Sequence, residues 1–278
     1  MNPKVTVLMS CKNSKPKLLE KSIKAVLGQT YKNFEFIIID DGSDNPIEPL
    51  VNSISTDSRI KIYRLKPSGL GAALTYGIEK ASGEYIARID DDDLMTHNRI
   101  EIQVKYLDEH QDVSCVGSQR YSYCNNKYIK HRKFPLDHET IMQSTLAMKW
   151  SMAHTALMYR RECVRQIGCY RVKGTGEDLD LILQLGTVGR LANIDEYLLY
   201  YNLSMGSLSA KSSQLPGHLW ALEKFKESIF YSKYSDIIDN SISILKRRIN
   251  ANNTKFLWKK WILLKIIMLF GKTIPKAL

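Results

Sequence analysis

Four consecutive aspartates, Asp90 to Asp93, stand in the stretch Gly83-Glu84-Tyr85-Ile86-Ala87-Arg88-Ile89-Asp90-Asp91-Asp92-Asp93-Leu94. The apolar-leaning run before them is typical of a buried strand, so the aspartates would lie at the carboxyl end of that strand. Carboxylates this close repel one another, and a bound Mg²⁺, which usually shares its shell with substrate phosphates, relieves the repulsion. The stretch therefore predicts a metal–phosphate site at the edge of an open α/β sheet. The alternative is an acidic surface loop or a helix N-terminus, where Asp is also favoured.

The residues before this stretch alternate between strand and helix patterns. Apolar runs predict strands at 5–9, 34–39 and 60–65. Helical spacing of apolar residues predicts helices at 18–27, 47–54 and 72–80. This alternation predicts an α/β fold with a parallel sheet and right-handed crossovers. In such sheets ligands bind outside the carboxyl ends of the strands. The second strand also ends in acid, at Asp40-Asp41, which favours a site over a surface loop.

The chain after Leu94 has less regular patterns. They predict helices at 98–110, 137–146 and 161–167, strands at 113–117, 156–159 and 198–201, and a hairpin through Asn125-Asn126. A glycine-punctuated acidic loop, Gly174-Thr175-Gly176-Glu177-Asp178-Leu179-Asp180, opens a further helix that runs to Val188. The acidic residues of this loop suit either a helix N-terminus, on dipole grounds, or a functional site.

The composition is that of a globular protein in a reducing compartment. The chain has 278 residues, 44% of them hydrophobic, which permits one large α/β domain or a domain with an appendage. Five cysteines without a C-x-x-C pair suggest neither a disulfide framework nor a zinc site. The N-terminus shows no signal-peptide core, so we expect a cytoplasmic protein.

The positive charge is concentrated at the C-terminus. The formal net charge is +11, and residues 240–278 hold nine basic residues and no acidic one. The nearly neutral body argues against nucleic-acid binding, and the basic tail favours an anionic partner. The apolar run 256–270 is too short to span a bilayer, which takes about 20 residues. Trp258 and Trp261 beside lysines suit an anionic membrane surface, and the alternative is a helix packed on the protein body or on another subunit.

Several segments, taken in order, resemble the family 2 glycosyltransferases, which are inverting nucleotide-sugar enzymes with the GT-A fold. The matching segments are Val5 to Ser10, Ala25 to Glu35, Ile39 to Ser43, Gly83 to Asp93, Ala153 to Arg160 and Gly176 to Asp178. The resemblance covers about residues 4–210 and implies a Rossmann-like, mostly parallel central sheet flanked by helices. We expect a GT-A domain at 1–212 and a helical, basic region at 213–278, which lies outside the resemblance.

On the donor side, the resemblance assigns Ser10 and Asp41 to the nucleotide pocket, with Asp41 accepting from the uracil ring. Asp90 and Asp92 match the D-x-D pair of the family. Asp92 would bind Mn²⁺ or Mg²⁺ on the diphosphate, and Asp90 would contact the ribose or the nucleotide. Many relatives carry Tyr-Arg-x-His after the last strand, with the His reaching the metal. Here Tyr201-Asn202-Leu203-Ser204 stands there, so the metal would need a weaker third ligand or a water.

On the acceptor side, the resemblance assigns Asp178 as the catalytic base, with Glu177 beside it contacting the acceptor or the base. His154 matches a position near the acceptor, and its alternative is a satisfied core histidine. The metal would neutralise the leaving diphosphate, and the base would deprotonate the attacking hydroxyl. One base opposite the leaving group implies a single displacement and an inverted configuration.

These expectations combine into an enzyme, a metal-dependent hexosyltransferase. It would move a sugar from a nucleotide-sugar, UDP-hexose or UDP-N-acetylhexosamine, to a growing glycan or lipid-linked acceptor in capsule, O-antigen or lipopolysaccharide synthesis. Two alternatives stay open: a degenerate transferase that scaffolds a glycan-assembly complex, and a sugar nucleotidyltransferase. The nucleotidyltransferases have no counterpart of the Gly-Glu-Asp loop. We expect the residues that choose the sugar between Arg120 and Trp150.

Overall fold

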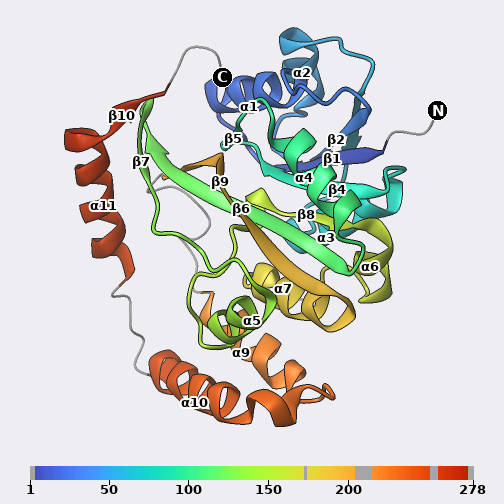
Figure 1. Cartoon of the computed structure of the whole chain (residues 1–278). Coiled ribbons are helices and arrows are strands. Elements are labelled where there is room, and N and C mark those ends of the chain that lie inside the picture. The colour runs from blue at the N-terminus through green and yellow to red at the C-terminus, as the bar shows by residue number, and fades with distance from the viewer. Residues whose placement is uncertain (1–3, 172–173, 204–213, 251–255, 275–278) are drawn as a thin grey trace.

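The structure is a computed structural model that describes residues 4–171, 174–203, 214–250 and 256–274, with side chains in the last segment from Ile262 onward. A single ten-stranded sheet runs through the described residues, with helices on both faces (Figure 1). The α/β architecture predicted from the sequence is confirmed.

One half of the sheet is parallel and is built by the first ninety residues. Its strands are β1 (Val5–Cys11), β2 (Phe34–Asp40), β3 (Ile60–Arg64) and β4 (Tyr85–Asp90), in the order β3-β2-β1-β4. Helices α1 (Pro16–Leu27), α2 (Glu48–Ile54) and α3 (Leu70–Lys80) connect them. Ser10 of β1 pairs with Asp90 of β4 on one side and Ile39 of β2 on the other, so the acidic strand ends meet at one edge.

The other half of the sheet is mixed. Its strands are β5 (Leu94–Met95), β6 (Val113–Cys124), β7 (Lys127–Lys130), β8 (Met158–Arg160), β9 (Arg190–Asn202) and β10 (Lys272–Thr273). Strand β8 runs antiparallel between β4 and β6, while β9 runs parallel to β6. The predicted strands 113–117 and 198–201 are each only part of a much longer strand. Register shifts at Ser118 and Gln119 interrupt the alternation of side chains, so the sequence pattern does not reveal the full length of either strand. The hairpin through Asn125-Asn126 is present, and both residues have positive φ.

The two faces of the sheet are covered by different helices. Alternate residues of one strand face opposite ways, so Leu8 joins one apolar cluster and Val7 joins the other. Helices α1, α2 and α4 (Arg99–Glu109) cover one face. The opposite face carries α3, α5 (His138–Leu146), α6 (Arg161–Gln166), α7 (Glu177–Val188), α9 (Leu215–Phe225) and α10 (Tyr231–Asn250).

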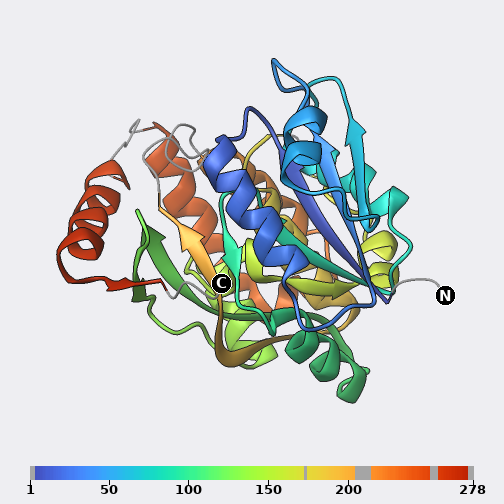
Figure 2. The ribbon, with the colours of Figure 1, turned by 90° about the horizontal axis from the view of Figure 1, so that it is seen from above.

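The helices after residue 213 fall into two groups. Leu222 and Phe225 of α9 and Ile238 of α10 are fully buried in the same apolar cluster as α5 and α7. The boundary predicted at residue 212 lies outside the described residues, and α9 and α10 share the core of the segment before it. Helix α11 (Phe256–Phe270) instead lies against β6 and β7, and β10 pairs with β7 at the end of the sheet far from β3 (Figures 1 and 2).

Candidate active site

The last residue of β4 is held by a buried arginine on the same strand. Arg88 is fully buried, and its Nη2 donates to Oδ1 of Asp90 at 2.5 Å. Burial by itself would lower the pKa of Arg88, but the negative charge of Asp90 raises it. The guanidinium therefore stays charged in the core and orients Asp90 at the sheet edge, opposite Ser10.

The three aspartates that follow are held by side chains and backbone from other elements. The Ser14 hydroxyl donates to Asp91, and Nδ2 of Asn202 donates to Oδ2 of Asp92 at 3.0 Å. The backbone N–H of Asn202 donates to Oδ1 of Asp93 at 2.7 Å. Asn202, at the end of β9, thus donates hydrogen bonds to two of the four aspartates.

The four aspartates lie close together, and they are partly buried except for Asp93, which is fully buried. Burial, followed by the charge of Asp90, raises the pKa of Asp92 to about 7. Burial also raises the pKa of Asp91 to about 6, although the Ser14 hydroxyl opposes the rise. Asp93 is fully buried, and burial together with the charge of Asp92 raises its pKa well above the usual range. An added positive charge would stabilise the ionised form of each of these carboxyls and lower its raised pKa.

This donor set fits a divalent cation that completes its shell with substrate phosphates. Among the described residues, no group of three or more His, Cys, Asp or Glu side chains could hold a metal by itself. Mg²⁺ commonly binds through one or two carboxylates, substrate phosphates and waters, and Asp92 supplies one such carboxylate. Asn202 occupies the position of the missing Arg, while Ser204 lies outside the described residues.

Asp41 fastens the loop that follows β3. Its Oδ1 accepts from the backbone N–H of Ser68 at 2.6 Å and from the Ser68 hydroxyl at 2.8 Å, and its Oδ2 accepts from the Gly69 N–H at 3.0 Å. The Gly69 N–H also lies 3.3 Å from Oδ1, so Oδ1 takes three of these four hydrogen bonds and Oδ2 takes one. Each carboxylate oxygen has about two lone pairs, so Oδ2 can still accept a further donor. Asp40, by contrast, is tied to Arg64 and the Ser43 N–H, which is a structural role.

The acidic loop reaches the same neighbourhood from the other half of the chain. Gly176 takes a left-handed conformation, with φ +97°, and α7 begins at Glu177. Glu177 is buried, and burial followed by the charge of Asp178 raises its pKa to about 7. Arg88 opposes this rise and Asp90 adds to it. The acidic loop and the D-x-D segment therefore act on each other through space, with Arg88 in common.

His154 also lies within electrostatic range of Arg88. It opens the single-turn helix η1 (His154–Ala156), and its Nε2 lies 2.8 Å from the hydroxyl of Tyr170. Burial, assisted by Arg88, lowers the pKa of His154 well below its usual value, so the imidazole is neutral at physiological pH. The hydrogen bond to Tyr170 fits a fixed, satisfied histidine beside the site.

Three residues around the site have no signal in the sequence motifs. In the sequence, Arg88 is a single charged residue within an apolar strand, and Asn202 is noticed only because it replaces the Arg of the Tyr-Arg-x-His segment. His218 lies in the first turn of α9, yet the charge of Asp178 acts on its imidazole. Each would be found only by knowing which distant segments pack together.

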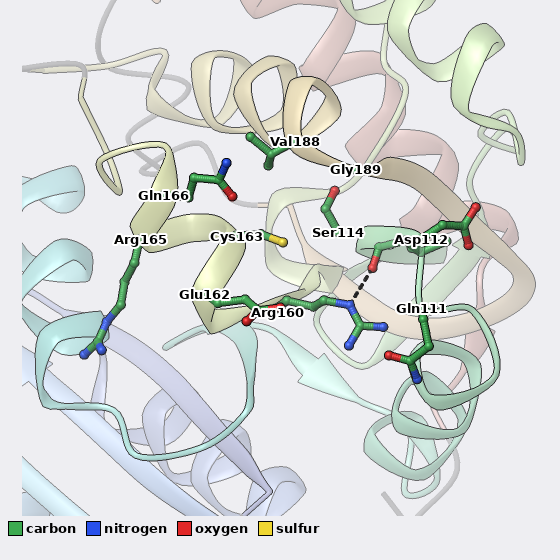
Figure 3. A pocket seen from close by; sticks show the side chains of 11 residues that line it. Gln111, Asp112, Ser114, Arg160, Glu162, Cys163, Arg165, Gln166, Val188 and Gly189 are labelled. Atoms are coloured by element: carbon green, nitrogen blue, oxygen red, sulfur yellow. Dashed lines mark hydrogen bonds between the residues drawn. The ribbon is translucent and has the colours of Figure 1, made fainter.

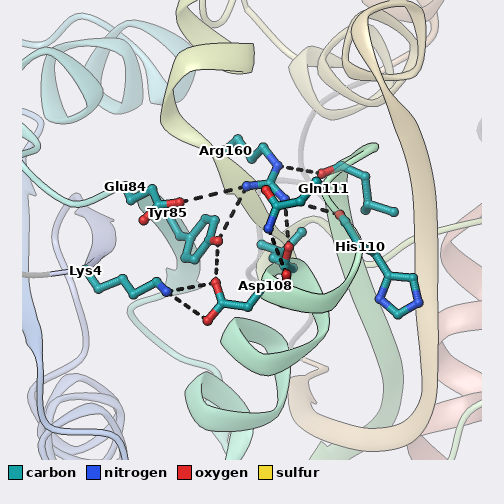
Figure 4. Close-up of polar contacts among 9 residues, drawn as sticks. Lys4, Glu84, Tyr85, Asp108, His110, Gln111 and Arg160 are labelled. Atoms are coloured by element: carbon teal, nitrogen blue, oxygen red, sulfur yellow. Dashed lines mark hydrogen bonds and ion pairs between the residues drawn. The ribbon is translucent and has the colours of Figure 1, made fainter.

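A cavity of about 720 Å³ lies away from these residues (Figure 3). It is lined by Arg160 and Cys163 and lies at the start of β4, since Arg160 pairs with Tyr85. The guanidinium of Arg160 already donates to backbone carbonyls: Nε donates to that of Val113 at 2.9 Å, and Nη2 donates to that of Leu107 at 2.7 Å. Figure 4 shows this network continuing to Asp108, which ties β4 to α4. We therefore assign the arginine a structural role.

Comparison with known proteins agrees with the geometry of the acidic edge. Residues 6–168 match the family model "Glycosyl transferase family 2". The O-antigen biosynthesis glycosyltransferase WbnJ of Escherichia coli is 34% identical over 193 residues, which cover 67% of this chain and 75% of that protein. An uncharacterized glycosyltransferase of Rickettsia conorii is 33% identical over 67% of this chain, but the match spans only 31% of that longer relative.

Two solved structures share the fold at low sequence identity. S. aureus TarS 1–349, solved in complex with UDP-GlcNAc, superposes with a TM-score of 0.72 at 16% identity, covering 86% of this chain and 71% of that one. The mannosyltransferase PcManGT of Pyrobaculum calidifontis, solved with GDP-Man and Mn²⁺, gives 0.67 at 16% identity, covering 98% and 77%. With the family match and the acidic sheet edge, these findings show that the chain belongs to glycosyltransferase family 2 and has the GT-A fold.

Proposed function

We propose that the protein transfers a sugar from a nucleotide-sugar, with UDP as the preferred nucleotide, to a hydroxyl of a glycan or lipid-linked acceptor, with inversion of configuration. The supporting observation is that Arg88 and Asp90 both act on the pKa of Glu177, so the acidic loop lies within electrostatic range of the D-x-D edge. Relatives named for O-antigen and amylovoran biosynthesis support a surface polysaccharide as the product.

The donor would bind along the carboxyl ends of β1, β2 and β4. Ser10 and Asp41 would line the nucleotide pocket, and Asp90 would contact the ribose or nucleotide. Asp92 would hold Mn²⁺ or Mg²⁺, which when bound neutralises the charge that develops on the leaving diphosphate. Asn202 would keep the Asp92 carboxylate turned toward the diphosphate through its 3.0 Å hydrogen bond.

The acceptor would approach from the side of the Gly176 loop. Asp178 would take the proton of the acceptor hydroxyl while that oxygen bonds to the anomeric carbon and the bond from this carbon to the diphosphate breaks. With its pKa raised to about 7, Glu177 carries a proton part of the time at neutral pH and can donate a hydrogen bond to the acceptor. We place His154 behind this acceptor side, where it holds Tyr170.

Replacement of Asp178 by Asn tests the assignment of the base. The variant keeps the size of the side chain and loses its basicity, so we expect kcat to fall on the order of 100-fold or more while nucleotide affinity is kept. Asp195→Asn is the matched control, because Asp195 lies on the surface in an ion pair with Lys133. Unchanged turnover in Asp178→Asn would contradict the assignment, and a wild-type protein without turnover would favour the scaffold alternative.

We propose in addition that α11 attaches the enzyme to an anionic surface on the inner face of the cytoplasmic membrane. No helix of the described part of the chain is long and apolar enough to cross a membrane. Leu269 and Phe270 are 72% and 77% exposed, although Ile267 on the same helix is buried against the protein. Exposed apolar side chains in a segment without acidic residues suit binding in the plane of an anionic bilayer. The side chains of Trp258 and Trp261 lie outside the described residues.

Vesicle sedimentation tests this attachment. We expect binding to vesicles that contain anionic lipid, weaker binding to neutral vesicles, and a marked loss in the double variant Leu269→Ser, Phe270→Ser. Ile229→Ser is the control, because Ile229 is 89% exposed on a different part of the chain. Equal binding of the wild type and the double variant would contradict the proposal.

A further inference from the structure

Helix α9 begins in tight contact with the loop that carries the proposed base. A Cβ atom added to Gly217 would lie 1.7 Å from the carbonyl oxygen of Thr175. A Cβ atom added to Gly176 would lie 3.0 Å from both the backbone and Cδ2 of His218. The two segments are thus packed backbone to backbone, with no space for a methyl group between them. Any movement of the first turn of α9 must be transmitted to the loop.

His218 is the side chain that this packing brings under the Gly176 turn. Its Nδ1 is buried and has no hydrogen-bond partner among the described residues. A buried, unpaired polar atom costs about 1–3 kcal/mol, so such an atom calls for an explanation. The unpaired Nδ1 would be explained if its hydrogen-bond partner arrived only with the substrates, as an acceptor hydroxyl or a water bound to the acceptor.

The charged groups that act on His218 come from the two helices packed against α9. Burial lowers the pKa of the imidazole, the carboxylate of Asp178 on α7 raises it, and Arg248 on α10 lowers it. Since burial is the largest influence, His218 is neutral at physiological pH. A neutral imidazole beside Asp178 leaves the carboxylate free to take a proton, whereas an imidazolium would pair with it.

We propose that His218 is a positioning residue for Asp178, which fixes the base loop from α9 and keeps the carboxylate available to the acceptor. This inference rests on the proposed function, because it takes Asp178 as the base. It brings α9 into the working site, although this helix begins well after the residues matched by the family model. The enzyme would then need residues 215–225 for turnover and not only for stability.

Titration of His218 by NMR tests the electrostatic influence of Asp178 on the imidazole without any substrate. In Asp178→Asn the imidazole loses the neighbouring negative charge, so its pKa should fall relative to the wild type. The control is His138 at the start of α5, whose pKa is lowered by burial and on which Glu139, Lys233, Arg190 and Asp137 act, so its titration should be the same in both proteins. An unchanged titration of His218 would overturn the proposal, and this readout stays valid even if the wild type transfers no sugar.

Kinetics of His218→Gln separate positioning from a purely structural role. We expect kcat to fall on the order of 10- to 100-fold, as for a base displaced by a fraction of an ångström to about 1 Å, with the donor KM unchanged. The acid limb of the pH–rate profile should also become less steep, because the protonation of His218 no longer contributes to it. A variant with the wild-type pH profile, or one whose nucleotide affinity falls with kcat, would overturn the proposal.

Discussion

Replacement of Gly217 by Ala is the sharpest structural perturbation of the base loop. The new Cβ would lie 1.7 Å from the Thr175 carbonyl oxygen, and real Cβ atoms essentially never approach closer than 3.0 Å. The obstacle is backbone, so no side chain can turn away. Either the loop or the first turn of α9 must therefore move by more than about 1 Å, which is the displacement that costs on the order of 100-fold in rate.

Two opposing effects on stability accompany this movement. Alanine favours a helix over glycine by about 1 kcal/mol, whereas forcing a methyl group into a packed interface costs about 1–3 kcal/mol. We therefore expect Gly217→Ala to remain folded, with a free energy of unfolding lowered by no more than about 2 kcal/mol. The nucleotide pocket should be spared, since Ser10 and Asp41 lie on other elements. The expected signature is a kcat lowered about 100-fold with UDP affinity kept.

Steady-state release of UDP, isothermal titration with UDP and urea unfolding measure these three quantities. Pro216→Ala is the matched control, because Pro216 is the neighbouring residue on α9 and is exposed. Wild-type turnover in Gly217→Ala would refute the reasoning, since it would mean that the loop position does not depend on α9. A parallel loss of turnover and UDP affinity would refute it as well, because the damage would then be general.

Three further predictions follow from polar contacts away from α9. Asn202→Leu removes the amide that holds Asp92, so about 10-fold more Mn²⁺ should be needed for half-maximal binding of UDP, measured by calorimetry; unchanged affinity would contradict this. Burial acts to raise the pKa of Glu35, but hydrogen bonds led by that from Lys61 lower it to about 2. Glu35→Gln should therefore lower the free energy of unfolding by about 1 kcal/mol above pH 5, after allowance for solvent screening. The difference in melting temperature between variant and wild type should vanish as the pH falls toward 2. A difference that does not change with pH would contradict the assignment of this stability to the Glu35 carboxylate. Arg99 donates to three backbone carbonyls in the core, so Arg99→Leu should lower the free energy of unfolding by about 3 kcal/mol in urea, and a loss below about 1 kcal/mol would contradict the network.

The sequence supports the prediction of the donor half well, because local patterns determine it. Continuous apolar runs that end in Asp40 and Asp90 mark parallel strands, and parallel strands bring their carboxyl ends to one edge. The structure confirms this edge, with Ser10 paired to Asp90. The roles assigned to these residues remain predictions.

The acceptor half is harder to predict, because it depends on contacts between distant segments. Strand β9 shifts register against β6, so its length is not visible as an alternating pattern. Asn202 contacts Asp92 from 110 residues away, and the contact exists only because β9 ends beside β5. Nothing in the helical pattern around His218 marks it as a neighbour of Asp178. Residue type and spacing identify candidates, while tertiary packing decides which of them meet.

The central claim is metal-assisted transfer from a nucleotide-sugar at the Asp90–Asp92 edge. Its most direct test measures UDP release from a panel of UDP-sugars, with and without Mn²⁺, for the wild type and for Asp92→Ala. We predict release from one donor that requires the metal and is abolished in the variant, while the variant remains folded. A wild-type protein that neither binds UDP nor releases it from any donor, with or without Mn²⁺, would contradict the account.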